Sequence, residues 1–127
     1  MKIGIVGLGR MGAGLAERLR RHGHEVVGYD RNPEISQVAS YQQLVDALSP
    51  PRVVWLMVPA GDATQATIDE VGPLLAGGDI VVDGGNSYYK DSVRRAADLA
   101  ERDVKFLDAG TSGGVWGLEE GFCLMVG

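Results

Sequence analysis

The sequence places a glycine-rich loop, Gly7-Leu8-Gly9-Arg10-Met11-Gly12, directly after its first apolar run. A helical stretch follows the loop, and in this strand–loop–helix context a G-x-G-x-x-G loop holds a pyrophosphate. Gly7 permits the tight turn, Gly9 lets the backbone approach the phosphates, and Gly12 lets the helix pack close to the strand. The N-terminus of that helix presents unpaired N–H groups to the phosphates. The loop therefore predicts a dinucleotide site.

An acidic residue follows the second apolar run at the distance that completes this pattern. Asp30 lies about 20 residues beyond the loop, where a carboxylate accepts hydrogen bonds from the adenosine ribose. It would accept both ribose hydroxyls of NAD and repel the 2′-phosphate of NADP, whose charge is about −1.5 to −2. A hydrogen bond to a charged group contributes about 1.5–3 kcal/mol, which is a preference of one or two orders of magnitude. Asp30 can also cap the turn at Asn32-Pro33, and the two roles are compatible.

Arg31 keeps a second cofactor open. An arginine at this position can lie over the adenine ring or pair with a 2′-phosphate. We therefore expect NAD as the cofactor, with NADP as the alternative.

Three further segments combine glycine with polar residues at the ends of predicted strands. They are Val58-Pro59-Ala60-Gly61, Asp83-Gly84-Gly85-Asn86-Ser87 and Asp108-Ala109-Gly110-Thr111-Ser112-Gly113-Gly114. Ligands of open α/β sheets bind outside the carboxyl ends of the strands. We therefore expect these segments and the glycine loop to share one rim.

The elements that must position these residues alternate along the chain. Strand-like runs are expected at 2–6, 24–29, 52–58, 79–82, 104–107 and 122–126, and the main helices at 11–21, at 63–75 and from Ser87 onward. The last of these helices carries an apolar stripe of Val93, Ala96, Ala97 and Ala100 at helical spacing. Strands that alternate with helices form a parallel sheet with right-handed crossovers. The prediction is an α/β fold, a Rossmann-type doubly wound parallel sheet of about six strands in the order 3-2-1-4-5-6.

Composition excludes several other classes of function. The net charge is −5 and no basic tract is present, which argues against nucleic acid as a partner. The apolar stretches are of strand length, shorter than the roughly 20 residues that span a membrane. The single cysteine, Cys123, excludes an internal disulfide, suits the cytoplasm, and is expected as a buried strand residue. We find no cluster of residues with metal-ligand spacing and expect no metal site.

The segments Asp83-Gly84-Gly85-Asn86-Ser87 and Thr111-Ser112-Gly113-Gly114 together resemble 6-phosphogluconate dehydrogenase (decarboxylating), within the β-hydroxyacid dehydrogenase superfamily. The related 3-hydroxyisobutyrate-type enzymes share the glycine loop and the Ser-Gly-Gly segment but usually differ at Gly-Gly-Asn-Ser. Gly9 and Asp30-Arg31-Asn32 resemble the shorter, NAD-preferring branch, since the longer members carry alanine and Asn-Arg-Thr at these places and use NADP.

The resemblance implies a role for each motif. The loop from Gly7 to Gly12 would hold the pyrophosphate, and Asp30 to Asn32 the adenosine ribose. Val58, Pro59 and Ala60 would line the path to the nicotinamide, and Asn86 would meet both nicotinamide and substrate. The remaining segment, Ser112, Gly113 and Gly114, would bind a phosphorylated sugar acid through a hydroxyl and backbone N–H groups.

The resemblance covers residues 1–127 as a dinucleotide-binding domain and implies a helical C-terminal domain that is absent here. The family's lysine base and glutamate acid are expected beyond Gly127, so no catalytic residue is assigned within the chain, which we expect to be inactive alone. The full-length protein is expected to be a homo-oligomer. Two alternatives stay open: a dehydrogenase for another β-hydroxyacid, such as 3-hydroxyisobutyrate, and a non-catalytic dinucleotide-binding module.

Overall fold

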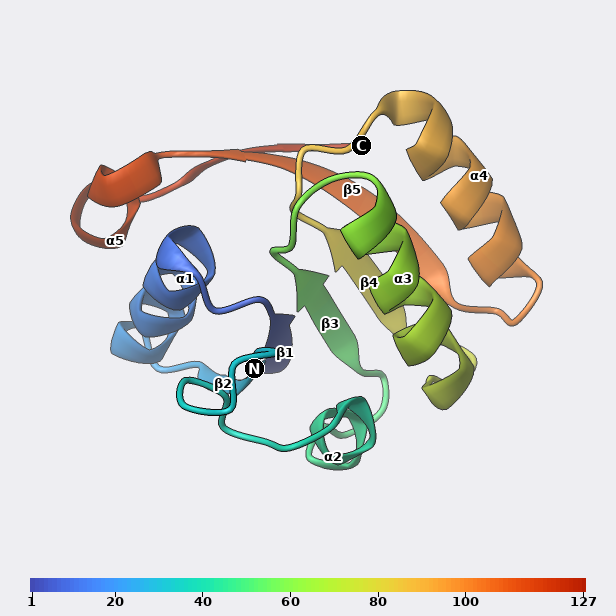
Figure 1. The fold of residues 1–127 in the computed structure, drawn as a ribbon, viewed down its shortest axis with the longest axis horizontal. Helices are drawn as coiled ribbons and strands as arrows, with labels where there is room; N and C mark the ends of the chain where they lie inside the picture. Colours follow the sequence, from blue (N-terminus) through green and yellow to red (C-terminus); the bar gives the residue numbers. More distant parts are fainter.

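Strands and helices alternate along the chain, and the strands form one six-stranded sheet (Figure 1). The computed structural model describes the backbone of residues 1–127 and every side chain except that of Val115. The strands are β1 (Lys2–Val6), β2 (Glu25–Tyr29), β3 (Val53–Leu56), β4 (Ile80–Asp83), β5 (Lys105–Ser112) and β6 (Cys123–Val126). The helices are α1 (Arg10–Arg21), α2 (Tyr41–Asp46), α3 (Asp62–Val71), α4 (Tyr89–Ala100) and α5 (Gly117–Glu120), with short 3-10 turns at Gly72–Leu74 and Gly114–Trp116.

The predicted Rossmann-type class and the number of strands are confirmed, but the predicted order 3-2-1-4-5-6 is wrong. The observed order is β2-β1-β3-β4-β5-β6. After β2 the chain forms only the short helix α2, and Leu44 of this helix and Leu48 just after it pack over Gly4 of β1. It then returns to the other side of β1, where Gly4 pairs with Val54. The second strand is therefore an edge strand. The chain passes from β1 to β2 on one side and continues from β3 onward on the other side, so the crossover connections diverge between β1 and β3.

The last strand also departs from the expected parallel arrangement. Residue Ser112 of β5 pairs with Cys123 of β6, and Ala109 pairs with Val126, so β6 runs antiparallel to β5. The connection between them contains only a 3-10 turn and the four-residue helix α5. A parallel return needs a crossover of a dozen or more residues, so this short connection reverses the chain.

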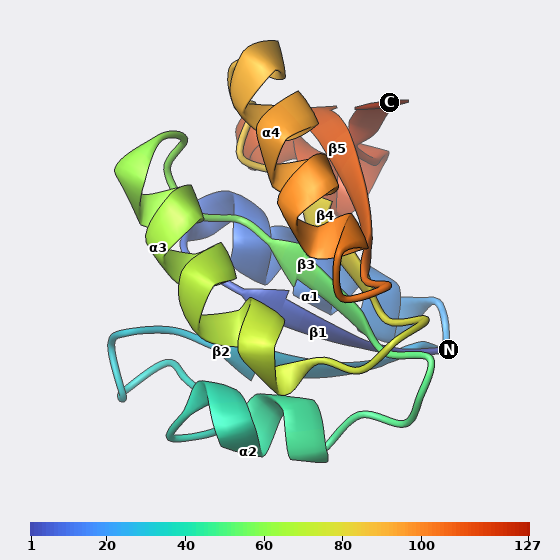
Figure 2. The same cartoon turned by 90° about the vertical axis from the view of Figure 1, so that its right-hand side faces the viewer.

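Helices cover both faces of the sheet, and Figure 2 shows α3 and α4 on the face opposite α1. The alternation of side chains along β1 divides the core in two. Ile3 and Ile5 pack against Leu15 of α1, in one cluster. Val6 belongs to the other cluster, together with Leu44 of α2, Leu48 just after it, and Ile68, Val71 and Leu99 of α3 and α4. The ends of β1 and β3 are thus held between two packed layers.

Helix α4 turns a different face to the sheet from the one predicted. Val93 is 68% exposed, and Ala97 and Ala100 are exposed as well. The buried residues of the helix are Ser92, Arg95 and Leu99. The prediction ranked side chains by apolarity alone, whereas the ion-paired Arg95 takes the inward position.

Cys123 is exposed, which corrects the expectation of a buried strand residue. All four residues of β6 are exposed, and neither hydrophobic core cluster contains a residue of this strand.

Candidate dinucleotide site

The three glycines of the loop have three different environments. Gly7 has φ +95°, and a Cβ there would overlap the carbonyl of Met57. A Cβ on Gly12 would overlap the carbonyl oxygen of Gly7. Gly9 has no atom within 4 Å of its Cβ position, and it lines a pocket. The fold itself therefore requires Gly7 and Gly12, whereas the open position at Gly9 leaves room for a ligand.

Helix α1 begins at this loop with its amide groups uncapped. Gly9 is the N-cap residue, no side chain caps the helix, and its first turn contains no acidic residue. The first amides of a helix have no intrahelical acceptor and carry the positive end of its dipole. Arg10 is exposed and Met11 is half-buried, and neither lines the pocket. An anion at the loop would therefore meet backbone groups.

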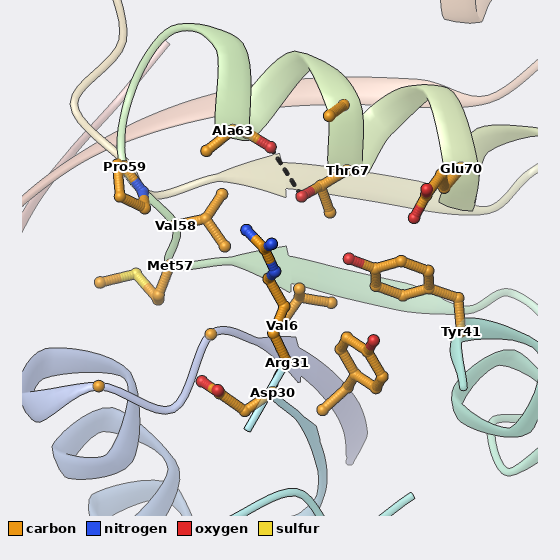
Figure 3. A pocket seen from close by; sticks show the side chains of 14 residues that line it. Val6, Asp30, Arg31, Tyr41, Met57, Val58, Pro59, Ala63, Thr67 and Glu70 are labelled. Atoms are coloured by element: carbon orange, nitrogen blue, oxygen red, sulfur yellow. Dashed lines mark hydrogen bonds between the residues drawn. The ribbon is translucent and has the colours of Figure 1, made fainter. Parts of the chain in front are cut away.

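A pocket of about 570 Å³ opens where the crossovers diverge, between the ends of β1 and β3 (Figure 3). Ligand pockets usually measure about 300–1,000 Å³, so it has the size of a cofactor site. Six of the predicted cofactor residues line it: Gly7, Gly9, Asp30, Arg31, Val58 and Pro59. Predicted residues outside its lining are Leu8, Arg10, Met11, Gly12, Asn32, Ala60 and Asn86.

The carboxylate of Asp30 binds the glycine loop directly. One oxygen accepts a hydrogen bond from the backbone N–H of Leu8 at 2.7 Å, and the other accepts from the N–H of Asn32 at 2.9 Å. The predicted capping of the Asn32 turn is therefore present. A carboxylate has about four lone-pair sites, so two remain for a ligand. The side chain of Asn32 accepts from the N–H of Glu34 and stabilises the turn.

Helices α2 and α3 form a wall that the sequence analysis did not predict. Figure 3 shows Tyr41, Thr67 and Glu70 across the pocket from Asp30, with the side chain of Arg31 extending into the space between. Burial raises the pKa of the Tyr41 phenol, although the neighbouring Thr67 side chain acts in the opposite direction. The phenol is therefore a neutral group at physiological pH.

A sequence signal for this wall was available on α3. Its pocket-lining residues Ala63, Ala66, Thr67 and Glu70 recur at i, i+3, i+4 and i+7. That spacing marks one face of a helix. Because this stripe mixes small, polar and acidic residues, it does not form an apolar stripe that the sequence pattern would reveal.

The ends of β4 and β5 bring a second group of predicted residues together. Asn86 has φ +57°, its side-chain amide donates to the carbonyl of Thr111 at 3.2 Å, and its carbonyl oxygen accepts from the N–H of Thr111 at 3.0 Å. Ser112 follows directly and is exposed, as are Gly113 and Gly114. The loop before Asn86 touches the pocket wall, because a Cβ on Gly85 would meet the carbonyl of Val58. The second group thus lies beside the pocket but outside its lining.

Across the described residues, no group of three or more His, Cys, Asp or Glu side chains could hold a metal ion. Among the same residues, no helix is both long and apolar enough to cross a membrane.

Comparison with known proteins gives a consistent family. The model of the NAD binding domain of 6-phosphogluconate dehydrogenase matches residues 2–127. A 6-phosphogluconate dehydrogenase of Haloferax volcanii, described as NAD(+)-dependent and decarboxylating, is 48% identical over the whole chain, which spans 44% of that protein.

Solved structures agree with this assignment. The 6-phosphogluconate dehydrogenase of Plasmodium falciparum, solved apo and with NADP+ and 6-phosphogluconate, matches with a TM-score of 0.89 and 30% identity over 99% of this chain and 30% of that one. The 3-hydroxyisobutyrate dehydrogenase of Mycobacterium tuberculosis gives a TM-score of 0.88 and 26% identity over 99% and 46% of the two chains. This chain therefore spans less than half of these proteins.

Proposed function

The chain belongs to the family of the NAD binding domain of 6-phosphogluconate dehydrogenase, and we propose that it binds NAD for an enzyme that oxidatively decarboxylates 6-phosphogluconate. The observation that carries the proposal is the pocket between β1 and β3, which joins an open Gly9 to the carboxylate of Asp30. NAD, when bound, accepts a hydride from the substrate. The loop Gly7 to Gly12 would hold its pyrophosphate, because the uncapped first turn of α1 suits an anion.

Charge at the ribose end of the pocket favours NAD over NADP. Asp30 keeps two lone-pair sites free after its bonds to Leu8 and Asn32, which is enough for the two ribose hydroxyls. A 2′-phosphate with a charge of about −1.5 to −2 would lie against this carboxylate. Arg31 lines the same pocket and would offset part of that repulsion, so NADP remains the weaker alternative.

The substrate is assigned to the second group of residues. In the proposed reaction, 6-phosphogluconate would be oxidised at the C3 hydroxyl, with bound NAD as the hydride acceptor, and the resulting β-keto acid would lose CO₂ to give ribulose 5-phosphate. Val58, Pro59 and Ala60 would lead to the nicotinamide, and Asn86 would orient the reacting hydroxyl beside it, since an amide both donates and accepts. Ser112 and the amide groups of Gly113 and Gly114 would bind the sugar acid.

We assign proton transfer to a part of the protein outside these 127 residues. Lys2 and Lys105 stand at the first residues of β1 and β5, at the edge of the sheet opposite the pocket, and Lys90 is exposed on α4. A lysine base and a glutamate acid in a helical C-terminal domain complete the proposal, with the full-length enzyme a homo-oligomer in the cytoplasm. The isolated chain is then expected to bind cofactor and to turn over no 6-phosphogluconate.

The test of cofactor choice is calorimetric titration of the protein and of Asp30→Ala with NAD and with NADP. We expect the unsubstituted protein to prefer NAD by about 10- to 100-fold, because charge-assisted hydrogen bonds contribute about 1.5–3 kcal/mol. Asp30→Ala should lower the affinity for NAD and narrow the preference. Asp98→Ala, on α4 outside the pocket, removes the same charge and should change neither the affinity for NAD nor the preference for NAD over NADP.

Equal affinities for NAD and NADP, or an unchanged ratio in Asp30→Ala, would contradict the assignment. A substrate panel on the full-length protein separates the two enzyme alternatives. Oxidation of 3-hydroxyisobutyrate without 6-phosphogluconate turnover would exclude the proposed substrate, and the absence of turnover with any β-hydroxyacid would favour a non-catalytic module.

A further inference from the structure

Arg95 is a buried arginine with partners on three separate segments. Its side chain lies on α4 and is 2% exposed. The guanidinium donates from Nε to the side-chain oxygen of Gln65 at 2.9 Å, and from Nη2 to the carbonyl of Gly61 at 3.3 Å. Its Nη1 donates to the hydroxyl of Ser87 at 3.2 Å and pairs with the carboxylate of Asp83 at 3.5 Å. Burying a charge costs several kcal/mol unless it is well paired, so this site is built around the guanidinium.

Gln65 lies on α3, and the other three partners lie on the two loops that flank the proposed nicotinamide position. Gly61 ends the loop after β3 that contains Val58, and Asp83 and Ser87 enclose the loop after β4 that contains Asn86. One side chain therefore binds both loops. A carbonyl, a carboxylate and a hydroxyl accept from it at different angles, which suits the planar fork of five donors in arginine and not the single ammonium of lysine.

A backbone hydrogen bond from the N–H of Gly84 to the carbonyl of Leu56 at 2.8 Å joins the β4 loop to the end of β3, and Gly85 packs against the carbonyl of Val58. Among the described residues, the other side-chain hydrogen bonds of the two loops are separate. The hydroxyl of Thr64 donates to the carbonyl of Pro59 at 2.8 Å, which fixes the first loop to α3. The second loop is fixed to β5 by the paired hydrogen bonds of Asn86 with Thr111, and internally by the bond from the N–H of Gly85 to Asp83 at 2.9 Å. Each of these side-chain bonds acts within one loop or ties it to its own neighbour, whereas the side chain of Arg95 joins the two.

We propose that Arg95 is a positioning residue that sets the spacing between the β3 and β4 loops and thereby the binding of the nicotinamide half of the dinucleotide. This inference rests on the proposed function, because it takes these loops as the nicotinamide site. The adenosine half lies against Asp30 and Arg31, which the Arg95 network does not touch. Substitutions at Arg95 should therefore weaken the binding of the nicotinamide half of the cofactor and leave the binding of the adenosine half unchanged.

The experiment compares NAD with ADP-ribose, which lacks the nicotinamide. Dissociation constants for both are measured by calorimetry on the 127-residue protein, on Arg95→Lys and on Ser87→Ala, with thermal midpoints in parallel. The unsubstituted protein should bind NAD more tightly than ADP-ribose. We expect Arg95→Lys to reduce that advantage by about three- to tenfold, the loss of one or two hydrogen bonds, with the constant for ADP-ribose unchanged. Ser87→Ala should shift the ratio in the same direction by less.

Arg94→Lys is the matched control, because Arg94 is the neighbouring exposed arginine, and among the described residues it hydrogen-bonds to Gln65 and pairs with Asp91 without contacting either loop. This variant should leave the ratio of the dissociation constants for NAD and ADP-ribose unchanged. Equal affinity of the unsubstituted protein for NAD and ADP-ribose would overturn the inference, as would an unchanged ratio in a folded Arg95→Lys. If Arg95→Lys does not fold, an unchanged ratio in Ser87→Ala overturns it in the same way. Failure of the unsubstituted protein to bind either compound would instead refute the proposed function.

Discussion

Alanine substitutions at three glycines around the start of α1 should have three different effects. Gly9, Gly12 and Gly14 lie within six residues of one another, and a change in helix preference alone would affect Gly12 and Gly14, both inside α1, similarly. Their surroundings differ, however. A Cβ on Gly12 would overlap the carbonyl of Gly7, one on Gly9 meets no atom within 4 Å, and one on Gly14 meets the ring of Phe122 at 3.4 Å, an ordinary contact.

The expected magnitudes follow from these surroundings. Gly14→Ala should raise the free energy of unfolding by about 0.5–1 kcal/mol, because alanine is the better helix former. Gly12→Ala has the same helix gain, but overlap with a backbone oxygen costs about 1–3 kcal/mol, so the net effect is destabilising by about 1–2 kcal/mol. At Gly9 the poorer N-cap costs about 1 kcal/mol, and the stiffer unfolded chain offsets about 0.4–1 kcal/mol, so stability should stay within about 0.5 kcal/mol.

Cofactor affinity should instead change most at Gly9. A methyl group on Gly9 occupies the space left for the pyrophosphate, and losing one charge-assisted hydrogen bond there costs about 1.5–3 kcal/mol, or at least tenfold in the dissociation constant for NAD. Gly14→Ala should bind NAD as the unsubstituted protein does. Urea denaturation monitored by the fluorescence of the half-buried Trp55 measures the stabilities, and calorimetry measures the affinities. A Gly9→Ala variant that is as unstable as Gly12→Ala, or that binds NAD normally, would refute this account of the loop.

Two further predictions concern stability. The carboxylate of Asp79 is fully buried: burial alone would raise its pKa, but the N–H groups of Ala76 and Arg52 and the Arg52 guanidinium hold it below its ordinary value. A lowered folded-state pKa stabilises the protein above the unfolded pKa of about 3.9, and that stability is lost as the pH falls through the folded value. Asp79→Asn should therefore lose about 1.5–3 kcal/mol at pH 7, and the difference should shrink below about pH 4; a constant difference in urea unfolding at both pH values would contradict this. Gly84→Ala places a Cβ against the Trp55 indole and the Met57 sulfur and should destabilise by about 1–3 kcal/mol, whereas an unchanged urea midpoint would show that this packing yields freely.

The pocket residues that were predicted and those that were missed lie on different kinds of segment. Gly7, Gly9, Asp30, Arg31, Val58 and Pro59 were predicted from the sequence and line one pocket. They follow strands, and the carboxyl ends of parallel strands meet at one edge whatever the strand order. Tyr41, Thr67 and Glu70 were missed, because a residue on a helix joins such a site only when the helix packs beside it.

The local pattern of the sequence determined the alternation of strands and helices, the Rossmann-type class and the glycine loop, since each depends on residues within a few positions of one another. Strand order depended on the path of the chain after β2, and the direction of β6 on a connection too short for a crossover. The burial of Arg95 was equally hidden, because its acceptors come from three segments: Gln65 on α3, Gly61 in the loop after β3, and Asp83 and Ser87 around the loop after β4. Pairing between distant segments is a property of the packed core, and only the tertiary structure decided it.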